Sequence, residues 1–257
     1  MAGRIALMPD GDPSSFTRVL YGCDADDVAE IVLMTPIKDW WETLKLRSDG
    51  VEEFNGFNRG FNGVFGGVEV SVFDSRVGSP VVLDCAYYLR FTPCRKIVFN
   101  GLIGALQPPI RVGDVIVPTA ALRGEGASKY FVEELYPAVA DFELLRSLAS
   151  TLDDVYGATD HMVHYGPVYT TDAFAAETDE FLEVWRDRNL LGIEMETSVV
   201  YTIAALYGMK AVSFHVVSDN PLLKKSFFDP LTIDEKRRRE ECTELLFDAL
   251  EKYVGAI

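Results

Sequence analysis

A strand that ends in an acid constrains this chain more than any other feature. Residues 211–217 read Ala-Val-Ser-Phe-His-Val-Val, apolar enough for a buried strand, and Ser218 and Asp219 follow at once. Shortly before it, residues 192–196 read Gly-Ile-Glu-Met-Glu and put two carboxylates at the start of a predicted helix. A carboxylate at the C-terminal edge of a strand, beside an acidic helix start, is typical of an α/β active site.

Short β-rich runs alternate with helical segments along the chain. We predict strands at residues 31–34, 68–73, 96–99, 115–117 and 211–217, and helices at 80–89, 141–152, 196–207 and 233–253. Residues 52–67 alternate aromatic residues with Asn and Gly, which is typical of a hairpin with tight turns. This order implies a mainly parallel, twisted sheet with helices on both faces. Without a repeat or a low-complexity linker, one domain over residues 1–257 is expected.

Composition narrows the class of partner. Asp and Glu number 40 against 24 Lys and Arg, so the net charge is −16 and no nucleic-acid partner is expected, because a phosphate backbone requires a basic face. No run of about 18 uncharged apolar residues occurs, so no membrane partner is expected. Without the apolar core of a secretory signal, we expect a cytoplasmic protein. The four cysteines are scattered, and no metal site is expected.

Several motifs follow one another in a fixed order after residue 60. They are the Gly- and Phe-rich hairpin at 60–72, Asp-Ser-Arg-Val-Gly-Ser-Pro at 74–80, Asn-Gly-Leu-Ile-Gly-Ala-Leu-Gln-Pro at 100–108, Thr-Thr-Asp-Ala-Phe at 170–174, Glu-Met-Glu at 194–196 and Ser-Asp at 218–219. In this order they resemble the nucleoside phosphorylase and nucleosidase superfamily, which contains purine nucleoside phosphorylase, uridine phosphorylase and methylthioadenosine nucleosidase. The resemblance implies a three-layer α/β/α sandwich whose mixed central sheet is partly closed into a barrel.

The resemblance also implies roles in cleaving the N-ribosidic bond of a nucleoside. Glu196 would hold the two ribose hydroxyls, Met195 would lie under the sugar, and Phe174 would stack on the base. Asp219 would act as general acid at the base, so that the base leaves as a neutral molecule. The same motifs add three substrate-binding candidates, which are Glu194, Ser218 and Gly101. Taken singly, a Glu at a helix start is often a cap, and an Asp after a strand often caps the next turn.

Asp219 favours a purine or purine-like base. Uridine phosphorylases lack an acid at this position and recognise uracil with Gln and Arg in the loop that follows the equivalent of Phe174. In this chain that loop, residues 175–180, reads Ala-Ala-Glu-Thr-Asp-Glu and carries neither residue. The scaffold therefore resembles uridine phosphorylase, while the predicted pocket resembles that of a purine enzyme.

The phosphate-binding arginines of the family have no clear counterpart. The loop after the first strand, residues 35–41, reads Thr-Pro-Ile-Lys-Asp-Trp-Trp, and Phe99 stands at the position of an arginine. A phosphate dianion requires guanidinium groups or several N–H donors. Two acceptors therefore stay open: phosphate as a co-substrate on a site rebuilt from Lys38, Arg59 or Arg76, or water activated by Asp39 or Glu42. No other cofactor is expected.

Two further expectations concern what the chain does as a whole. Family members assemble as dimers or hexamers, so a homo-oligomer is expected, and Trp40, Trp41 and segment 54–65 are predicted to supply apolar interface surface. A non-catalytic relative that binds or stores a nucleoside stays open as an alternative to the enzyme. The retained Glu196 and Asp219 argue against it, because two buried carboxylates are costly to keep.

Overall fold

One mixed sheet of ten strands organises the part of the chain that the computed structural model describes, which is residues 14–223 and 227–257. The strands are β1 Ile31–Thr35, β2 Asp49–Asn55, β3 Arg59–Phe65, β4 Val68–Asp74, β5 Lys96–Ala105, β6 Val115–Arg123, β7 Ala138–Val139, β8 Val163–Thr170, β9 Gly192–Glu194 and β10 Lys210–Asp219. The α-helices are α1 Ser14–Leu20, α2 Lys38–Leu46, α3 Ser79–Tyr88, α4 Phe142–Tyr156, α5 Asp179–Asp187, α6 Thr197–Leu206 and α7 Ile233–Val254. The predicted domain of 1–257 thus includes residues 1–13 and 224–226, which lie outside the described residues.

Five of the strands close into a barrel, four extend it as an open sheet, and the short β7 pairs with β6. The barrel runs β5–β10–β6–β8–β9 and returns to β5, because β9 pairs with β5 and β10 also pairs with β5. From β5 the open sheet continues through β1, β4, β3 and β2. The sheet contains both parallel pairs, such as β1–β5 and β5–β10, and antiparallel pairs, such as β6–β10 and β3–β4. The predicted mixed, partly barrel-like sheet is confirmed.

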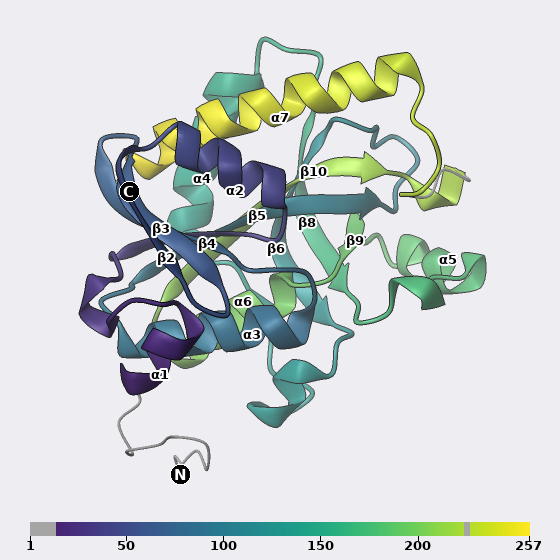
Figure 1. The fold of residues 1–257 in the computed structure, drawn as a ribbon. Helices are drawn as coiled ribbons and strands as arrows, with labels where there is room; N and C mark the ends of the chain where they lie inside the picture. Colours follow the sequence, from purple (N-terminus) through teal and green to yellow (C-terminus); the bar gives the residue numbers. More distant parts are fainter. Residues whose placement is uncertain (1–13, 224–226) are drawn as a thin grey trace.

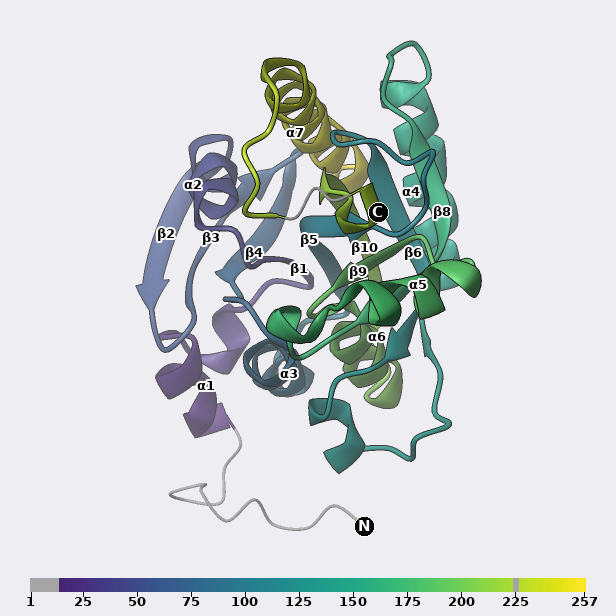
Figure 2. The same ribbon diagram turned by 90° about the vertical axis from the view of Figure 1, so that its right-hand side faces the viewer.

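Helices cover the sheet on two sides (Figures 1 and 2). Helices α3 and α6 pack on one side in a core that includes Phe99, Val200 and Tyr201. Helices α2, α4 and α7 pack on the other side, where the core includes Trp41, Phe214 and Phe247. Both cores consist almost entirely of aliphatic and aromatic side chains, whose removal from water supplies most of the favourable free energy of folding. The three-layer α/β/α sandwich is confirmed.

The two tryptophans predicted as interface surface are buried instead. Trp40 is 7% exposed and packs edge-on against Phe247 of α7, and Trp41 is 2% exposed and packs against Phe61 of β3. The Trp41 indole N–H also donates to the carbonyl of Val72 at 3.3 Å. The expectation that these side chains offer surface to another subunit is therefore wrong: they hold α2 against the sheet.

The topology brings the ends of several strands together. In the parallel register of the sheet, β1, β4, β5 and β10 all end on the same side, and ligand sites of α/β sheets lie at such carboxyl ends. Among the described helices, none has the length and apolar character that crossing a membrane requires.

Candidate active site

Glu194 ends β9 and Glu196 directly precedes α6, and their carboxylates make different hydrogen bonds. Glu194 accepts hydrogen bonds from the Thr170 hydroxyl at 2.5 Å and from the backbone N–H groups of Glu196 and Thr197 at 2.8 and 2.7 Å. It therefore satisfies the open N–H groups of the first turn of α6, as a capping carboxylate does. Although it lines the pocket described below, its main contacts fix the position of Glu196.

Glu196 faces the turn after β4. Its Oε1 accepts the N–H of Gly78 at 2.6 Å, and the Ser79 hydroxyl donates to the carbonyl of the neighbouring Met195 at 2.5 Å. Glu196 is 5% exposed. Burial, aided by the charge of Glu194, raises the pKa of the Glu196 carboxyl to about 8.

Asp219 lies at the end of β10, where the register against β5 shifts between Val217 and Asp219. Its Oδ1 accepts the Ser218 hydroxyl at 2.5 Å, and a Cβ placed on Gly104 would lie 3.6 Å from both carboxylate oxygens. The carboxylate thus stands over β5. Asp219 is 5% exposed, and burial raises the pKa of its carboxyl above the ordinary value, while the Ser218 hydroxyl opposes the rise.

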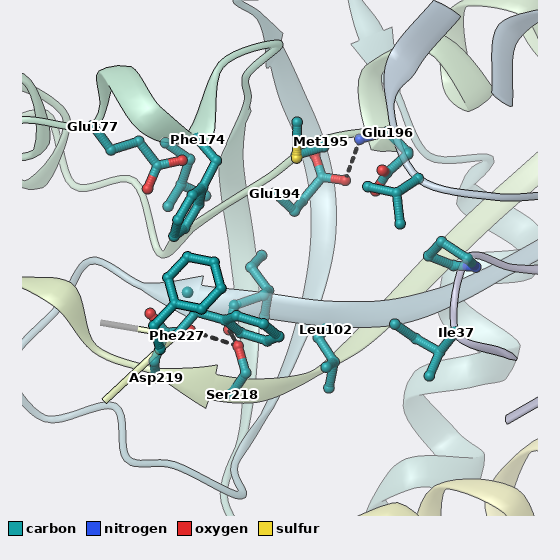
Figure 3. Close-up of a pocket in the computed structure, with 16 residues that line it drawn as sticks. Ile37, Leu102, Phe174, Glu177, Glu194, Met195, Glu196, Ser218, Asp219 and Phe227 are labelled. Carbon is teal, nitrogen blue, oxygen red and sulfur yellow. Dashed lines mark hydrogen bonds between the residues drawn. The ribbon is translucent and has the colours of Figure 1, made fainter. Parts of the chain in front are cut away.

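These carboxylates line one cavity of about 320 Å³, a volume within the range of small-molecule sites. Asp219, Ser218 and Glu177 lie at one end with the rings of Phe174 and Phe227 (Figure 3). Met195 lies between the ends, on the side of Glu194 and Glu196. The other end, beside Glu196, is formed by Pro36, Ile37, Val77 and Leu102. The pocket therefore has an aromatic and acidic end and an aliphatic end.

The structure brings six of the predicted site residues to this cavity: Phe174, Glu194, Met195, Glu196, Ser218 and Asp219. Gly101 does not line it, although the next three residues of β5 do, and a Cβ on Gly101 would meet the ring of Pro36 at 3.4 Å. Strand β5 thus presents Leu102 rather than Gly101 to the pocket.

None of the five predicted anion or water residues lines the cavity. The Arg59 Nε lies 2.9 Å from Asp74 and its Nη1 3.4 Å from Glu42, and its guanidinium stacks on Trp41 at 4.3 Å. The Arg76 guanidinium donates to the carbonyl of Phe57 at 2.9 Å.

Lys38 and Asp39 are exposed in the first turn of α2. Arg59 and Arg76 therefore interact with groups outside the cavity, and Lys38 and Asp39 do not line it.

Three residues at the aromatic and acidic end of the pocket were not predicted from the sequence. Glu177 lies in the loop after Phe174, and burial, aided by the charge of Asp219, raises the pKa of its carboxyl to about 7. An indication was present in the sequence, because Glu177 is an acid in the loop that the resemblance assigns to base recognition. Phe227 and Phe228 close the same end, and the Phe228 ring packs on Phe174 with centroids 5.4 Å apart. No periodic pattern marks these two rings as pocket residues.

The described residues contain no cluster of three or more His, Cys, Asp or Glu side chains arranged to hold a metal ion. The pocket groups are carboxyls, hydroxyls and aromatic rings, which suit hydrogen bonding and stacking. With two carboxyls of raised pKa at one end and a third at the other, the arrangement is able to donate and accept protons near neutral pH.

Three nucleoside phosphorylases are similar to this chain in sequence. A guanosine phosphorylase of Halorubrum lacusprofundi is 33% identical over 159 residues, 62% of this chain and 64% of that protein. A DeoD-type purine nucleoside phosphorylase of Proteus mirabilis is 28% identical over 203 residues, 76% of this chain and 82% of that protein. With a uridine phosphorylase of Haemophilus influenzae, the match is 32% over 159 residues and 63% of that protein. The chain thus spans just under two thirds of the first and third of these relatives.

A solved structure of uridine phosphorylase from Vibrio fischeri superposes with a TM-score of 0.83 at 23% identity, over 95% of this chain and 99% of that one, and so shares the fold. The sequence pattern of the phosphorylase superfamily matches residues 30–253, which include every residue of the cavity. The chain therefore belongs to the phosphorylase superfamily.

Proposed function

We propose that this protein cleaves the N-ribosidic bond of a purine nucleoside. The observation that carries the proposal is the pairing of Asp219 and Glu196 across one cavity, delivered by β10 and by the turn from β9 into α6, with Phe174 and Met195 on its walls. The names of two relatives, a guanosine phosphorylase and a purine nucleoside phosphorylase, support a purine as the base.

At the base end, Asp219 donates a proton. Its raised pKa keeps the carboxyl protonated at a higher pH than an ordinary aspartate, so it is poised to protonate a ring nitrogen of the base as the glycosidic bond breaks. Phe174, 37% exposed, offers one ring face to the base. The base then leaves as a neutral molecule.

At the sugar, Glu196 accepts hydrogen bonds from the ribose hydroxyls through Oε2, while Oε1 stays on the Gly78 N–H. Loss of the base leaves positive charge on C1′ and the ring oxygen, as in other glycoside cleavages. The ionised carboxylate of Glu196 stabilises that positive charge electrostatically.

The alternative is a non-catalytic protein that binds or stores a nucleoside. Against it stand three pocket carboxyls, Glu177, Glu196 and Asp219, whose pKa values are all raised by burial. Burying ionisable groups disfavours their charged forms, and such perturbed groups cluster at catalytic sites. Binding alone requires none of these shifts.

The proposal is tested by measuring the release of free base from four nucleosides side by side: guanosine, inosine, adenosine and uridine. A purine nucleoside as the best substrate supports it, and uridine as the best substrate contradicts the choice of base. Turnover that collapses in Asp219→Asn excludes the non-catalytic alternative, whereas binding without turnover in the wild type favours it.

We also propose a homo-oligomer, either a dimer or a hexamer, on the strength of the family resemblance. Phe57 in the β2–β3 turn is 55% exposed, so segment 54–65 retains some of the apolar surface expected of it even though Trp40 and Trp41 do not. Sedimentation velocity of the purified protein measures the assembly size.

A further inference from the structure

The aliphatic end of the cavity differs from a site built for an anion. Pro36 and Ile37 follow β1, Val77 follows β4, and Leu102 belongs to β5. Figure 3 shows Ile37 and Leu102 across the cavity from Glu196, on the side away from Phe174 and Asp219. The sugar carbon that loses the base would therefore face this end, if the base lies against Phe174.

The charged groups of the cavity are all acids. Its described lining contains Glu177, Glu194, Glu196 and Asp219, and no Lys, Arg or His side chain. A dianion placed beside Glu196 would lose its hydration without a compensating cation among the described lining residues, which is unfavourable in a largely apolar cavity. Transfer of a neutral molecule to the same position lacks that penalty.

Two backbone N–H groups at this end already donate to groups of the protein. The Gly78 N–H donates to Glu196 at 2.6 Å, and the Ile37 N–H donates to the Thr35 hydroxyl oxygen at 3.3 Å. Residues 101–103 of β5 lie in the ladder with residues 215–217 of β10, where strand pairing uses backbone donors. Backbone amides thus offer little to replace the missing cations.

The nearby arginines are held elsewhere. Arg59 pairs with Asp74 and Glu42, and Arg76 donates to the Phe57 carbonyl and stacks near the Phe57 ring at 5.2 Å. Neither lines the cavity.

We propose that the acceptor in this pocket is water rather than phosphate, so that the protein hydrolyses its nucleoside to free base and ribose. The inference rests on the proposed N-ribosidic cleavage and goes further than the phosphorylase names of the relatives. The C1′–N bond breaks with its electron pair going to the base, and Asp219 gives the base a proton. The water oxygen bonds to C1′, and its proton passes to the ionised form of Glu196, the carboxylate beside the aliphatic end. Both carboxyls then re-equilibrate with solvent.

The test uses the purified full-length protein with guanosine and inosine, in buffer freed of phosphate and in the same buffer with added inorganic phosphate. Base release is followed together with the sugar product, and a parallel reaction in water enriched in heavy oxygen traces the acceptor. We expect free ribose that carries the heavy oxygen, formed at the same rate with and without phosphate.

The outcomes separate this inference from the proposed function. Base release only with phosphate, with ribose 1-phosphate as product, overturns the inference and leaves N-ribosidic cleavage in place. No base release under either condition contradicts the proposed function and the inference together.

Substitutions of Arg76 provide a second test of the acceptor. Arg76 is the cation that could most readily rebuild an anion site, so Arg76→Ala is expected to keep the rate of ribose formation within about twofold. Arg76→Gln is the matched control, because it retains a polar side chain without the charge. A rate that falls more than about tenfold in both variants, together with loss of dependence on added phosphate, would place Arg76 on a phosphate and contradict the inference.

Discussion

The N–H of Gly78 donates to the carboxylate of Glu196 at 2.6 Å, so the turn after β4 and the start of α6 are joined directly at the pocket. The two residues are 118 positions apart in the chain. Gly78 has φ of +106°, a left-handed region that favours glycine, and it precedes α3. The conformation of this turn therefore helps to position a proposed ribose-binding carboxylate.

Replacing Gly78 with alanine tests that coupling. A Cβ at this position meets no atom within 4 Å, so the cost comes from the backbone angle alone, about 1 kcal/mol of unfolding free energy. We expect a lower Tm and a lower kcat/KM, because the turn shifts away from Glu196. The matched control is Gly67→Ala, which also has positive φ, +82°, and open space, but lies in the β3–β4 turn. Equal losses of activity in both variants would contradict the coupling.

The pH dependence of activity reports on Asp219. As a general acid it acts in its protonated form, and its pKa is raised, so activity is expected to fall as the pH rises through that value. The Ser218 hydroxyl lowers this pKa and Arg239 lowers it further, while Glu177 is the acid that faces it. Ser218→Ala should therefore move the falling limb to higher pH. Movement to lower pH, measured from kcat/KM profiles, would refute the assigned role.

Stability should respond to pH through Glu196. Its pKa is about 8 in the folded protein against 4.5 for the unperturbed group, so the folded state binds the proton more tightly. The stabilisation is fully present below the unfolded value and is lost as pH rises through about 8. Glu196→Gln removes this loss, so the variant should gain on the wild type by roughly a few kcal/mol between about pH 5 and pH 9. Parallel Tm curves for the two proteins across that range would show that Glu196 does not titrate this way.

Phe174 should affect binding of the base more than the stability of the fold. Its ring is 37% exposed and contacts Phe228 rather than the main cores. Phe174→Ala is expected to raise KM about tenfold with little change in Tm, because a stacking surface is lost. Phe174→Tyr, which keeps the ring, serves as the control and should stay within about twofold of the wild type. An unchanged KM in the alanine variant would remove Phe174 from the base site.

Much of the architecture follows from local sequence. The strand at 211–217 and the helices at 141–152 and 233–253 are observed at nearly the predicted positions, because long apolar or amphipathic runs determine them. Strand β8 was not predicted: it contains Gly166 and Pro167, which disfavour strands, and its pairing with β6 and β9 outweighs them. Strand β5 likewise runs six residues past Phe99, where the predicted strand ends, because β10 pairs with it there.

Part of the candidate site could also be predicted from the sequence, and part depends on tertiary contacts. Motifs that keep their order predicted the residues that deliver Asp219 and Glu196. The side chains of the aliphatic end, such as Ile37 and Leu102, are brought to the pocket by the parallel register of β1 and β5. Arg59 was a candidate on sequence proximity, but its ion pairs with Asp74 and Glu42 depend on tertiary contacts that sequence spacing does not encode.

The most direct test of the account is base release from guanosine by the wild type and by Asp219→Asn, measured at one pH on folded protein of equal Tm. We expect turnover in the wild type and a loss of about a hundredfold or more in the variant, because the leaving base is no longer protonated. Equal rates in the two proteins would contradict the assignment of Asp219, and no release from any purine nucleoside by the wild type would contradict the proposed function itself.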